Sequence, residues 1–211
     1  MQSSLSEAPI RAGHDPSVPP APQHDVAQIM GGLYGDGIIA LKGAFPRAWV
    51  EQLREDVDAA FAEARQRPGG TVGRGPMRWY AEIHPEDVRG FVDLVTHPWI
   101  VQVCEAVLGP EWRVVEIGFD VPGPGAMNQP WHRDFPSPPE TLVGRRLNSL
   151  AFNLTCVDTT ADMGPFEVAP GTQWDAPDGF AHGMFPPKEL YPRYEARAQR
   201  KFPQMGDISA R

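Results

Sequence analysis

Trp131-His132-Arg133-Asp134-Phe135-Pro136 places an imidazole and a carboxylate two residues apart, in a segment bounded by prolines at 130 and 136. The neighbouring residues carry no apolar repeat of helical period, and a residue that precedes proline avoids the helical region, so an extended segment is predicted. Side chains two residues apart point to the same side of an extended segment. His132 and Asp134 are therefore predicted to share a face, as two ligands of a two-histidine, one-carboxylate iron site.

A second triplet of this kind, His84-Pro85-Glu86, lies in different surroundings. Pro85 and two acidic residues precede an apolar series of helical spacing, which is the pattern of a first helical turn: Val88, Phe91, Val92 and Val95. Such triplets arise by chance in a chain with 27 acidic residues and six histidines, so the surroundings decide between them. His84 is predicted to belong to a helix start, and His132 to a metal site.

The composition restricts the class of protein. A chain of 211 residues with 41% hydrophobic residues suits a single domain with a core, and a formal net charge of −8 argues against nucleic-acid or anionic-membrane partners. No apolar run approaches a membrane span and the first ten residues lack a secretory signal pattern, so a cytoplasmic location is expected. Cys104 and Cys156 lie among apolar neighbours, which predicts buried thiols rather than a disulfide or a zinc site.

The first half of the chain is predicted to be helical. Residues 1–24, rich in Pro, Ala and Ser, are expected to form a disordered tail, and residues 25–211 a single domain. Helices are predicted at 26–33, after Pro46, and at 98–108. A short strand is predicted at 38–41, and the glycine-rich stretch 69–75 is interpreted as a loop because it lacks the ending of a phosphate-binding motif.

Beyond Gly109 the apolar period changes from helical to two. Strands are predicted at 114–120, 149–156 and 166–168, and a helix with a solvated basic face at 188–201. Helices followed by short antiparallel-type strands predict an α+β, mainly β fold, with helices packed on a sandwich or barrel.

Four segments together resemble the phytanoyl-CoA dioxygenase family of Fe(II)- and 2-oxoglutarate-dependent oxygenases. They run from Gly35-Asp36-Gly37 to Gly43, from His97-Pro98 to Pro110, through the Trp131 stretch, and from Met163 to Thr172. Their order and spacing extend over about residues 26–175, and the ordered set is far more specific than His-x-Asp by itself. The resemblance implies a double-stranded β-helix, a cupin-like jelly-roll with the N-terminal helices packed on one sheet.

The resemblance also implies a reaction. His132 and Asp134 would be catalytic iron ligands, and dioxygen and the cosubstrate 2-oxoglutarate would react to hydroxylate a small organic substrate, with release of succinate and CO2. An aspartate at 134 favours hydroxylation over halogenation, because related halogenases have a small residue there and bind chloride in its place. In the family, a later histidine completes the metal site and an arginine soon after it binds 2-oxoglutarate.

His182 is the sole histidine after Asp134, and it lies in a glycine-flanked stretch without a suitable following arginine. The last barrel strands, with the third ligand and the arginine, are therefore expected beyond Arg211. If they are missing, the alternative is a non-catalytic, shortened jelly-roll binding module. A cupin-type metal enzyme independent of 2-oxoglutarate is a third, less favoured alternative.

Polar residues near the motif are candidates for cosubstrate or substrate contacts. They are Gln129, with Asn128 beside it, and the polar face of the strand predicted at 149–156, Asn153 and Thr155. Equally, these side chains could satisfy hydrogen bonds of the barrel. Trp131 is expected to pack in the core rather than to wall the pocket.

Overall fold

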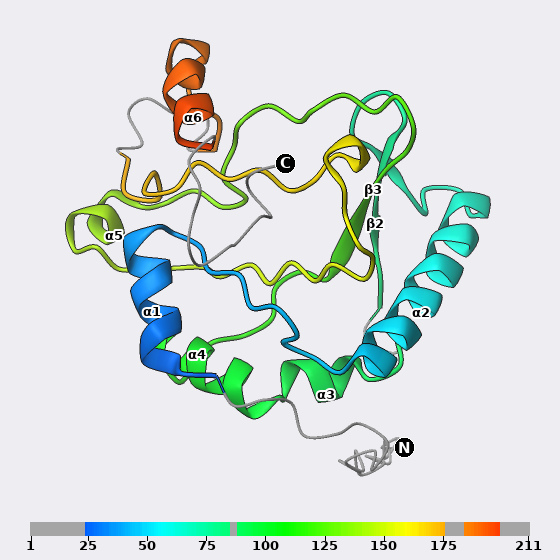
Figure 1. Ribbon diagram of the computed structural model, residues 1–211, viewed down its shortest axis with the longest axis horizontal. Coiled ribbons are helices and arrows are strands. Elements are labelled where there is room, and N and C mark those ends of the chain that lie inside the picture. The colour runs from blue at the N-terminus through cyan, green and yellow to red at the C-terminus, as the bar shows by residue number, and fades with distance from the viewer. Residues whose placement is uncertain (1–23, 85–87, 176–183, 199–211) are drawn as a thin grey trace, which may run out of the picture.

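The computed structural model describes residues 24–84, 88–175 and 184–198, and these contain six α-helices and a small antiparallel sheet (Figure 1). The predicted tail, apart from residue 24, and His182 lie outside the described residues. The α-helices are α1 (Val26–Gly35), α2 (Arg47–Gln66), α3 (Phe91–Val95), α4 (Pro98–Leu108), α5 (Pro139–Val143) and α6 (Tyr191–Ala198). The strands are β1 (Val72–Gly73), β2 (Arg78–Glu82) and β3 (Gly118–Pro122), and two short 3-10 helices are η2 (Ala161–Met163) and η4 (Lys188–Leu190).

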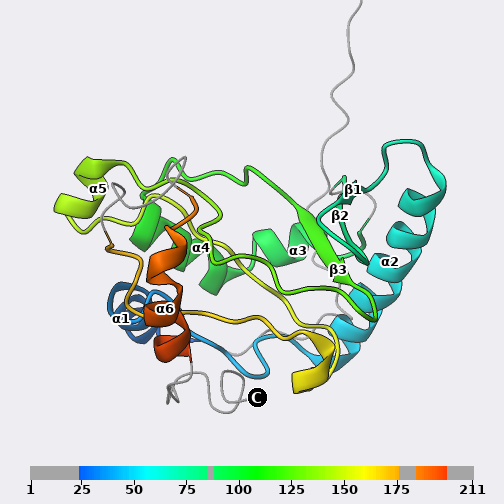
Figure 2. The ribbon, with the colours of Figure 1, turned by 90° about the horizontal axis from the view of Figure 1, so that it is seen from above.

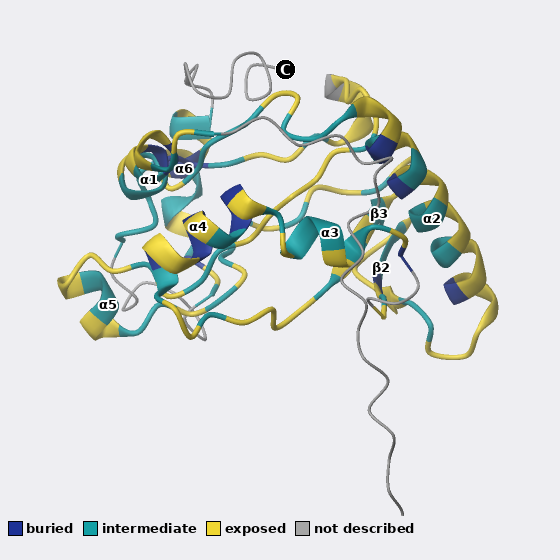
Figure 3. Cartoon of the chain, turned by 90° about the horizontal axis from the view of Figure 1, so that it is seen from below, coloured by how far each residue is buried: buried dark blue, intermediate teal, exposed yellow. Residues whose placement is uncertain are grey.

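Helices α1 and α4 pack together and form the larger core (Figures 1 and 3). The Asp25 carboxylate caps α1 by accepting from the backbone N–H of Ala27 at 2.9 Å. Pro98 opens α4 where its missing N–H has no cost, and Gly109 ends it at a φ of 93°. The helices predicted at 26–33 and 98–108 are thus confirmed. Their buried side chains are Ile29, Trp99, Ile100, Val103, Cys104 and Val107.

Helix α2 covers one face of the sheet (Figure 2). Its Phe61 ring lies 6.1 Å from Trp79 of β2 and 6.2 Å from Phe119 of β3, between ring centroids. Near its start, Trp49 and Leu53 form a second buried cluster with Val88. The prediction that an N-terminal helix packs on a sheet is confirmed for α2.

The sheet has the order β1-β2-β3, and its neighbouring strands are antiparallel. Tyr80 pairs with Asp120 and Arg78 with Pro122. Because side chains alternate along a strand, Trp79 and Phe119 face α2, whereas Arg78, Tyr80 and Asp120 share the opposite face. This polar face of the sheet, defined by those three residues, positions the candidate site.

Several strand predictions are wrong within the described residues. Stretches 38–41, 149–156 and 166–168 form no strand, and β3 begins at residue 118 rather than 114. The alternation in 149–156 has another cause, because three of its apolar side chains contact helices, while Leu154 is exposed. Leu150 packs on the α1–α4 core, Phe152 lies 6.2 Å from Trp99, and Cys156 packs on the α2 cluster. An α+β fold is confirmed, but the described sheet is not closed, so the jelly-roll barrel stays a prediction.

Two element boundaries also differ from the prediction. Stretch 69–75, predicted as a loop, contains the short strand β1. Helix α3 begins only at Phe91, because Gly90 before it adopts a left-handed φ of 74°. A Cβ at this position would lie 2.5 Å from Nε1 of Trp49, so the chain turns closely over that ring. The first helical turn predicted at Pro85 lies in part outside the described residues, and the described residues 88–90 are not helical.

Both cysteines are free. Cys104 is buried, as predicted, whereas Cys156 is only half-buried. Burial raises the pKa of both thiols. Within the described ranges, no helix combines the length and the apolar character that a membrane crossing requires.

Candidate metal centre

The segment that leads to His132 is fastened to the polar face of the sheet. Arg78 Nε lies 2.8 Å from Asp120 Oδ2, and Arg78 Nη1 donates to the backbone oxygen of Met127 at 3.1 Å. Gln129 Nε2 donates to the same Asp120 oxygen at 3.1 Å. The half-buried Arg78–Asp120 ion pair therefore holds residues 127–129, and with them the start of the motif, against β2 and β3.

The His132 ring is oriented by a backbone carbonyl. Its Nδ1 lies 2.8 Å from the oxygen of Pro130. Because a carbonyl only accepts, this contact places the proton of a neutral ring on Nδ1 and leaves the Nε2 lone pair available. Nε2 lies 3.5 Å from Asp134 Oδ1. The two side chains thus share a face, as the extended pattern predicts.

His132 and Asp134 each shift the pKa of the other. The hydrogen bond to Asp134 is the main cause that raises the pKa of His132, and burial opposes it. The same contact lowers the pKa of Asp134. The side chain of His132 is 26% exposed and that of Asp134 is 59% exposed, so the pair is open to a ligand from solvent.

The two donors fit a shared divalent metal ion. A divalent metal ion binds imidazole nitrogen and carboxylate oxygen at about 2.1 Å. It can therefore contact two such atoms only when they lie less than about 4.2 Å apart. The 3.5 Å separation lies within that limit. A carbonyl that receives the other ring N–H is also the usual partner of a metal-binding histidine. No group of three potential ligands occurs among the described residues, which exclude His182, so the fit concerns two ligands of the expected three.

Arg133, between the two candidate ligands, fastens other parts of the chain. Its backbone N–H donates to the Met184 oxygen at 2.8 Å. Its Nη2 donates to the backbone oxygens of Thr172 and Asp175 at 2.8 and 2.9 Å. The ring of Phe185 consequently lies 5.8 Å from that of His132 and forms part of its surroundings.

Helix α6 packs on the other side of the motif. Its buried Tyr194 lies 6.2 Å from Trp131, between ring centroids. Trp131 itself is half-buried and belongs to neither hydrophobic cluster, so it does not pack in the core as expected. Arg193 Nη2 lies 3.1 Å from Asp175 Oδ1, and Arg197 donates to the oxygen of Pro170 at 3.2 Å. Arg193 is still 48% exposed, as the solvated basic face predicted at 188–201 requires, whereas Arg197 is only half-exposed.

The residues predicted to contact a cosubstrate lie in different environments. Gln129 belongs to the Arg78–Asp120 network. Asn153 and Thr155 are exposed. Among the described residues, neither side chain forms a hydrogen bond with His132 or Asp134. The stretch that carries them passes from the α1–α4 core to the α2 cluster.

Sequence reasoning missed the polar face of the sheet. The signal was present in Arg78-Trp79-Tyr80-Ala81-Glu82, where polar and apolar side chains alternate as in a strand with one buried face. Arg74, in the turn between β1 and β2, lies over the same polar face, because its guanidinium carbon is 4.2 Å from the centroid of the Tyr80 ring.

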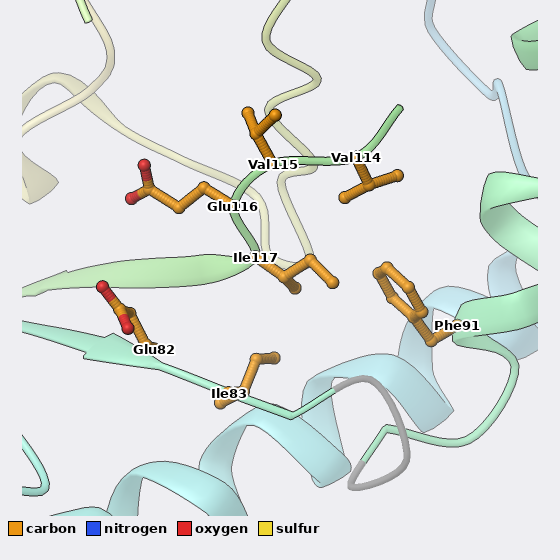
Figure 4. Close-up of a pocket in the computed structure, with 7 residues that line it drawn as sticks. All are labelled: Glu82, Ile83, Phe91, Val114, Val115, Glu116 and Ile117. Atoms are coloured by element: carbon orange, nitrogen blue, oxygen red, sulfur yellow. The ribbon is translucent and has the colours of Figure 1, made fainter. Parts of the chain in front are cut away.

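A cavity of about 430 Å³ lies at the other end of β2 and β3 (Figure 4). Glu82 and Glu116 lie along one side of it, and the remaining lining is apolar: Ile83, Phe91, Val114, Val115 and Ile117. Glu116 accepts a hydrogen bond from the Tyr80 hydroxyl. Glu82 lies about 13 Å along the strand from Arg78, so the cavity is separate from the His132–Asp134 pair.

A polar sheet face with an open His–Asp pair beside it defines a candidate mononuclear metal centre in an α+β protein. The model of the phytanoyl-CoA dioxygenase (PhyH) family matches residues 33–201. The chain therefore belongs to the phytanoyl-CoA dioxygenase family, as its sequence motifs indicate. Members of this family are in general Fe(II)- and 2-oxoglutarate-dependent oxygenases with a jelly-roll fold. No curated protein and no solved structure matches the chain.

Proposed function

We propose that this protein is an Fe(II)- and 2-oxoglutarate-dependent dioxygenase that hydroxylates a small organic substrate and releases succinate and CO2. One observation carries the proposal: in a chain of this family, His132 Nε2 and Asp134 Oδ1 lie 3.5 Å apart, with the imidazole oriented by the Pro130 carbonyl. Bound iron would supply the activation of dioxygen that no side chain can perform.

The chain's own residues would hold and orient the reactants. His132 and Asp134 provide two adjacent metal ligands and leave the solvent side of the pair open. The Asp120–Arg78 network positions the motif. We assign cosubstrate contacts to Gln129, Asn153 and Thr155, because all three are polar and two of them are exposed.

Anaerobic addition of Fe(II) and 2-oxoglutarate, followed by visible absorption, tests the proposal. We expect the weak metal-to-ligand band with the wild-type protein and its loss in His132→Ala and Asp134→Ala. On admission of oxygen, succinate should form slowly even without substrate. His84→Ala is the matched control, because it removes the exposed histidine of the other His-x-acid triplet.

Absence of both the band and succinate with the wild-type protein would refute the oxygenase assignment. That result would favour the alternative of a non-catalytic binding module. A band that persists in both His132→Ala and Asp134→Ala would instead place the metal elsewhere in the chain.

A further inference from the structure

The cavity at the end of β2 and β3 has a charged end and an apolar end. Figure 4 shows Glu82 and Glu116 on one side of it, and Phe91 and Val114 on the other. Its volume of about 430 Å³ lies within the range of about 300–1,000 Å³ that small-molecule sites occupy. The cavity can therefore hold one small molecule that is polar at one end and apolar along the rest.

The register of the sheet brings the two carboxylates to the same face. Glu82 of β2 pairs with Gly118 of β3, and Glu116 precedes Gly118 by two residues. The backbone N–H of Ile83 donates to the oxygen of Ile117 at 3.2 Å, which continues the pairing beyond the end of β3. Because side chains alternate along paired strands, Glu82 and Glu116 are diagonal neighbours on one face.

No basic side chain neutralises these carboxylates. Glu116 accepts a hydrogen bond from the Tyr80 hydroxyl, which is a neutral donor. In the described ranges neither Glu82 nor Glu116 forms an ion pair, and none of the seven residues that line the cavity is basic. Neighbouring like charges on a sheet repel, so a cation bound between them would relieve this repulsion.

The apolar lining combines a fixed part with an exposed part. Ile83 and Phe91 pack on the α2 cluster, which holds them in place. Val114 and Val115 are 47% and 71% exposed. An apolar group that enters the cavity would remove surface of these valines from water, which favours binding.

We propose that this cavity binds a primary amine that carries an alkyl or aromatic body. The ammonium group donates hydrogen bonds to Glu82 and Glu116, and the body covers Val115 and Phe91. A hard metal ion suits the cavity less well, because it requires about six oxygen ligands and the other five lining side chains are apolar. The site does not use the His132–Asp134 pair, so the inference is independent of the proposed function.

Isothermal titration calorimetry of the full chain at neutral pH tests the inference. The probes are hexylamine, 1-hexanol, which has the body without the charge, and methylamine, which has the charge without the body. We expect hexylamine to bind more tightly than either of the others. Glu82→Gln and Glu116→Gln should each lower the affinity for hexylamine about 5-fold, as expected for an exposed ion pair, and leave the affinity for hexanol unchanged.

The variants preserve the fold and have a matched control. The amide oxygen of Gln in Glu116→Gln still accepts from the Tyr80 hydroxyl. Glu105→Gln makes the same substitution at an exposed position of α4 outside the cavity lining, and it should bind hexylamine as the wild type does. Amide NMR shifts with hexylamine should change at residues 114–117 and not at 132–134.

Three results would overturn the inference. The first is a wild type that binds hexylamine no more tightly than hexanol or methylamine. The second is a loss of affinity in Glu105→Gln that equals the losses in Glu82→Gln and Glu116→Gln, or no loss in the latter two. The third is a set of amide shifts that lies outside residues 114–117. None of these measurements requires metal, so each result leaves the oxygenase assignment to its own test.

Discussion

Nδ1 of His132 lies 2.8 Å from the backbone oxygen of Pro130, two residues earlier in the chain. The contact is local, so the motif itself sets the tautomer and the direction of the ring. Nε2 is then directed toward Asp134 without help from a distant side chain. A partner of this kind raises the basicity of a metal-binding histidine and fixes its orientation.

Replacing either candidate ligand should abolish tight metal binding. Outer partners of metal ligands typically contribute 10- to 100-fold in affinity, so loss of a ligand should cost at least about 100-fold. We expect this for His132→Gln and Asp134→Asn, measured as Mn(II) binding by electron paramagnetic resonance. His84→Gln should bind Mn(II) as the wild type does, and an equal loss in this variant would contradict the assignment.

Arg133→Ala should destabilise the protein although the residue lies between the two ligands. Hydrogen bonds from a charged donor contribute about 1.5–3 kcal/mol each, so losing the contacts to Thr172 and Asp175 should lower the free energy of unfolding by about 3 kcal/mol. Urea denaturation measures the change. Arg133→Lys, which keeps the charge, should lose less, and a wild-type stability in Arg133→Ala would show that these contacts contribute nothing.

Gln173 closes the end of helix α1 from 138 residues away along the chain. Its Nε2 lies 3.1–3.3 Å from the backbone oxygens of Leu33, Tyr34 and Gly35. Gln173→Ala should cost about 1 kcal/mol of stability, because these terminal carbonyls lose a donor. Gln173→Glu should cost more, since it places negative charge at the negative end of the helix dipole.

Thermal unfolding compares the stability lost with the hydrogen-bond donor in Gln173→Ala and the stability lost with the added negative charge in Gln173→Glu. Amide hydrogen exchange shows where in the chain the loss occurs. Exchange should accelerate selectively in α1 in both variants. Trp174→Phe, which removes the bond from Nε1 to the Tyr34 oxygen, provides a milder comparison. A Gln173→Glu variant as stable as Gln173→Ala would contradict the dipole argument.

His97 should make stability depend on pH. Burial, and secondarily the nearby His24, lower the pKa of His97 below its ordinary value of 6.5. Its ring packs against Phe45 and Trp99, and its buried Nδ1 has no hydrogen-bond partner among the described residues. Below pH 6.5 the unfolded chain therefore binds the proton first, and stability falls as the pH falls toward the lowered pKa.

The free energy of unfolding, measured by urea denaturation between pH 8 and pH 5, checks this expectation. His97→Gln should flatten the decline below pH 6.5, because it removes the imidazole whose pKa burial lowers. An identical pH dependence in the wild type and His97→Gln would remove His97 as its cause.

The sequence by itself determined helices α1, α2 and α4, the family and the candidate ligand pair. Capping residues such as Asp25 and Pro98 act within one turn, so helix starts can be predicted from neighbouring residues. His132 and Asp134 share a face because extended backbone has a period of two, which is also a local property.

Only the tertiary structure decided what the alternating segments contact. Apolar and polar side chains alternate along residues 149–156 as in a strand, yet Leu150 and Phe152 contact helices. The period shows which side chains are buried, but it does not show which element they pack against. The position of the segment before His132 likewise depends on strands β2 and β3, because Arg78 and Asp120 bind Met127 and Gln129 from 49 and 9 residues away along the chain. Pairing between distant segments follows from packing of the whole chain, and neighbouring residues do not encode it.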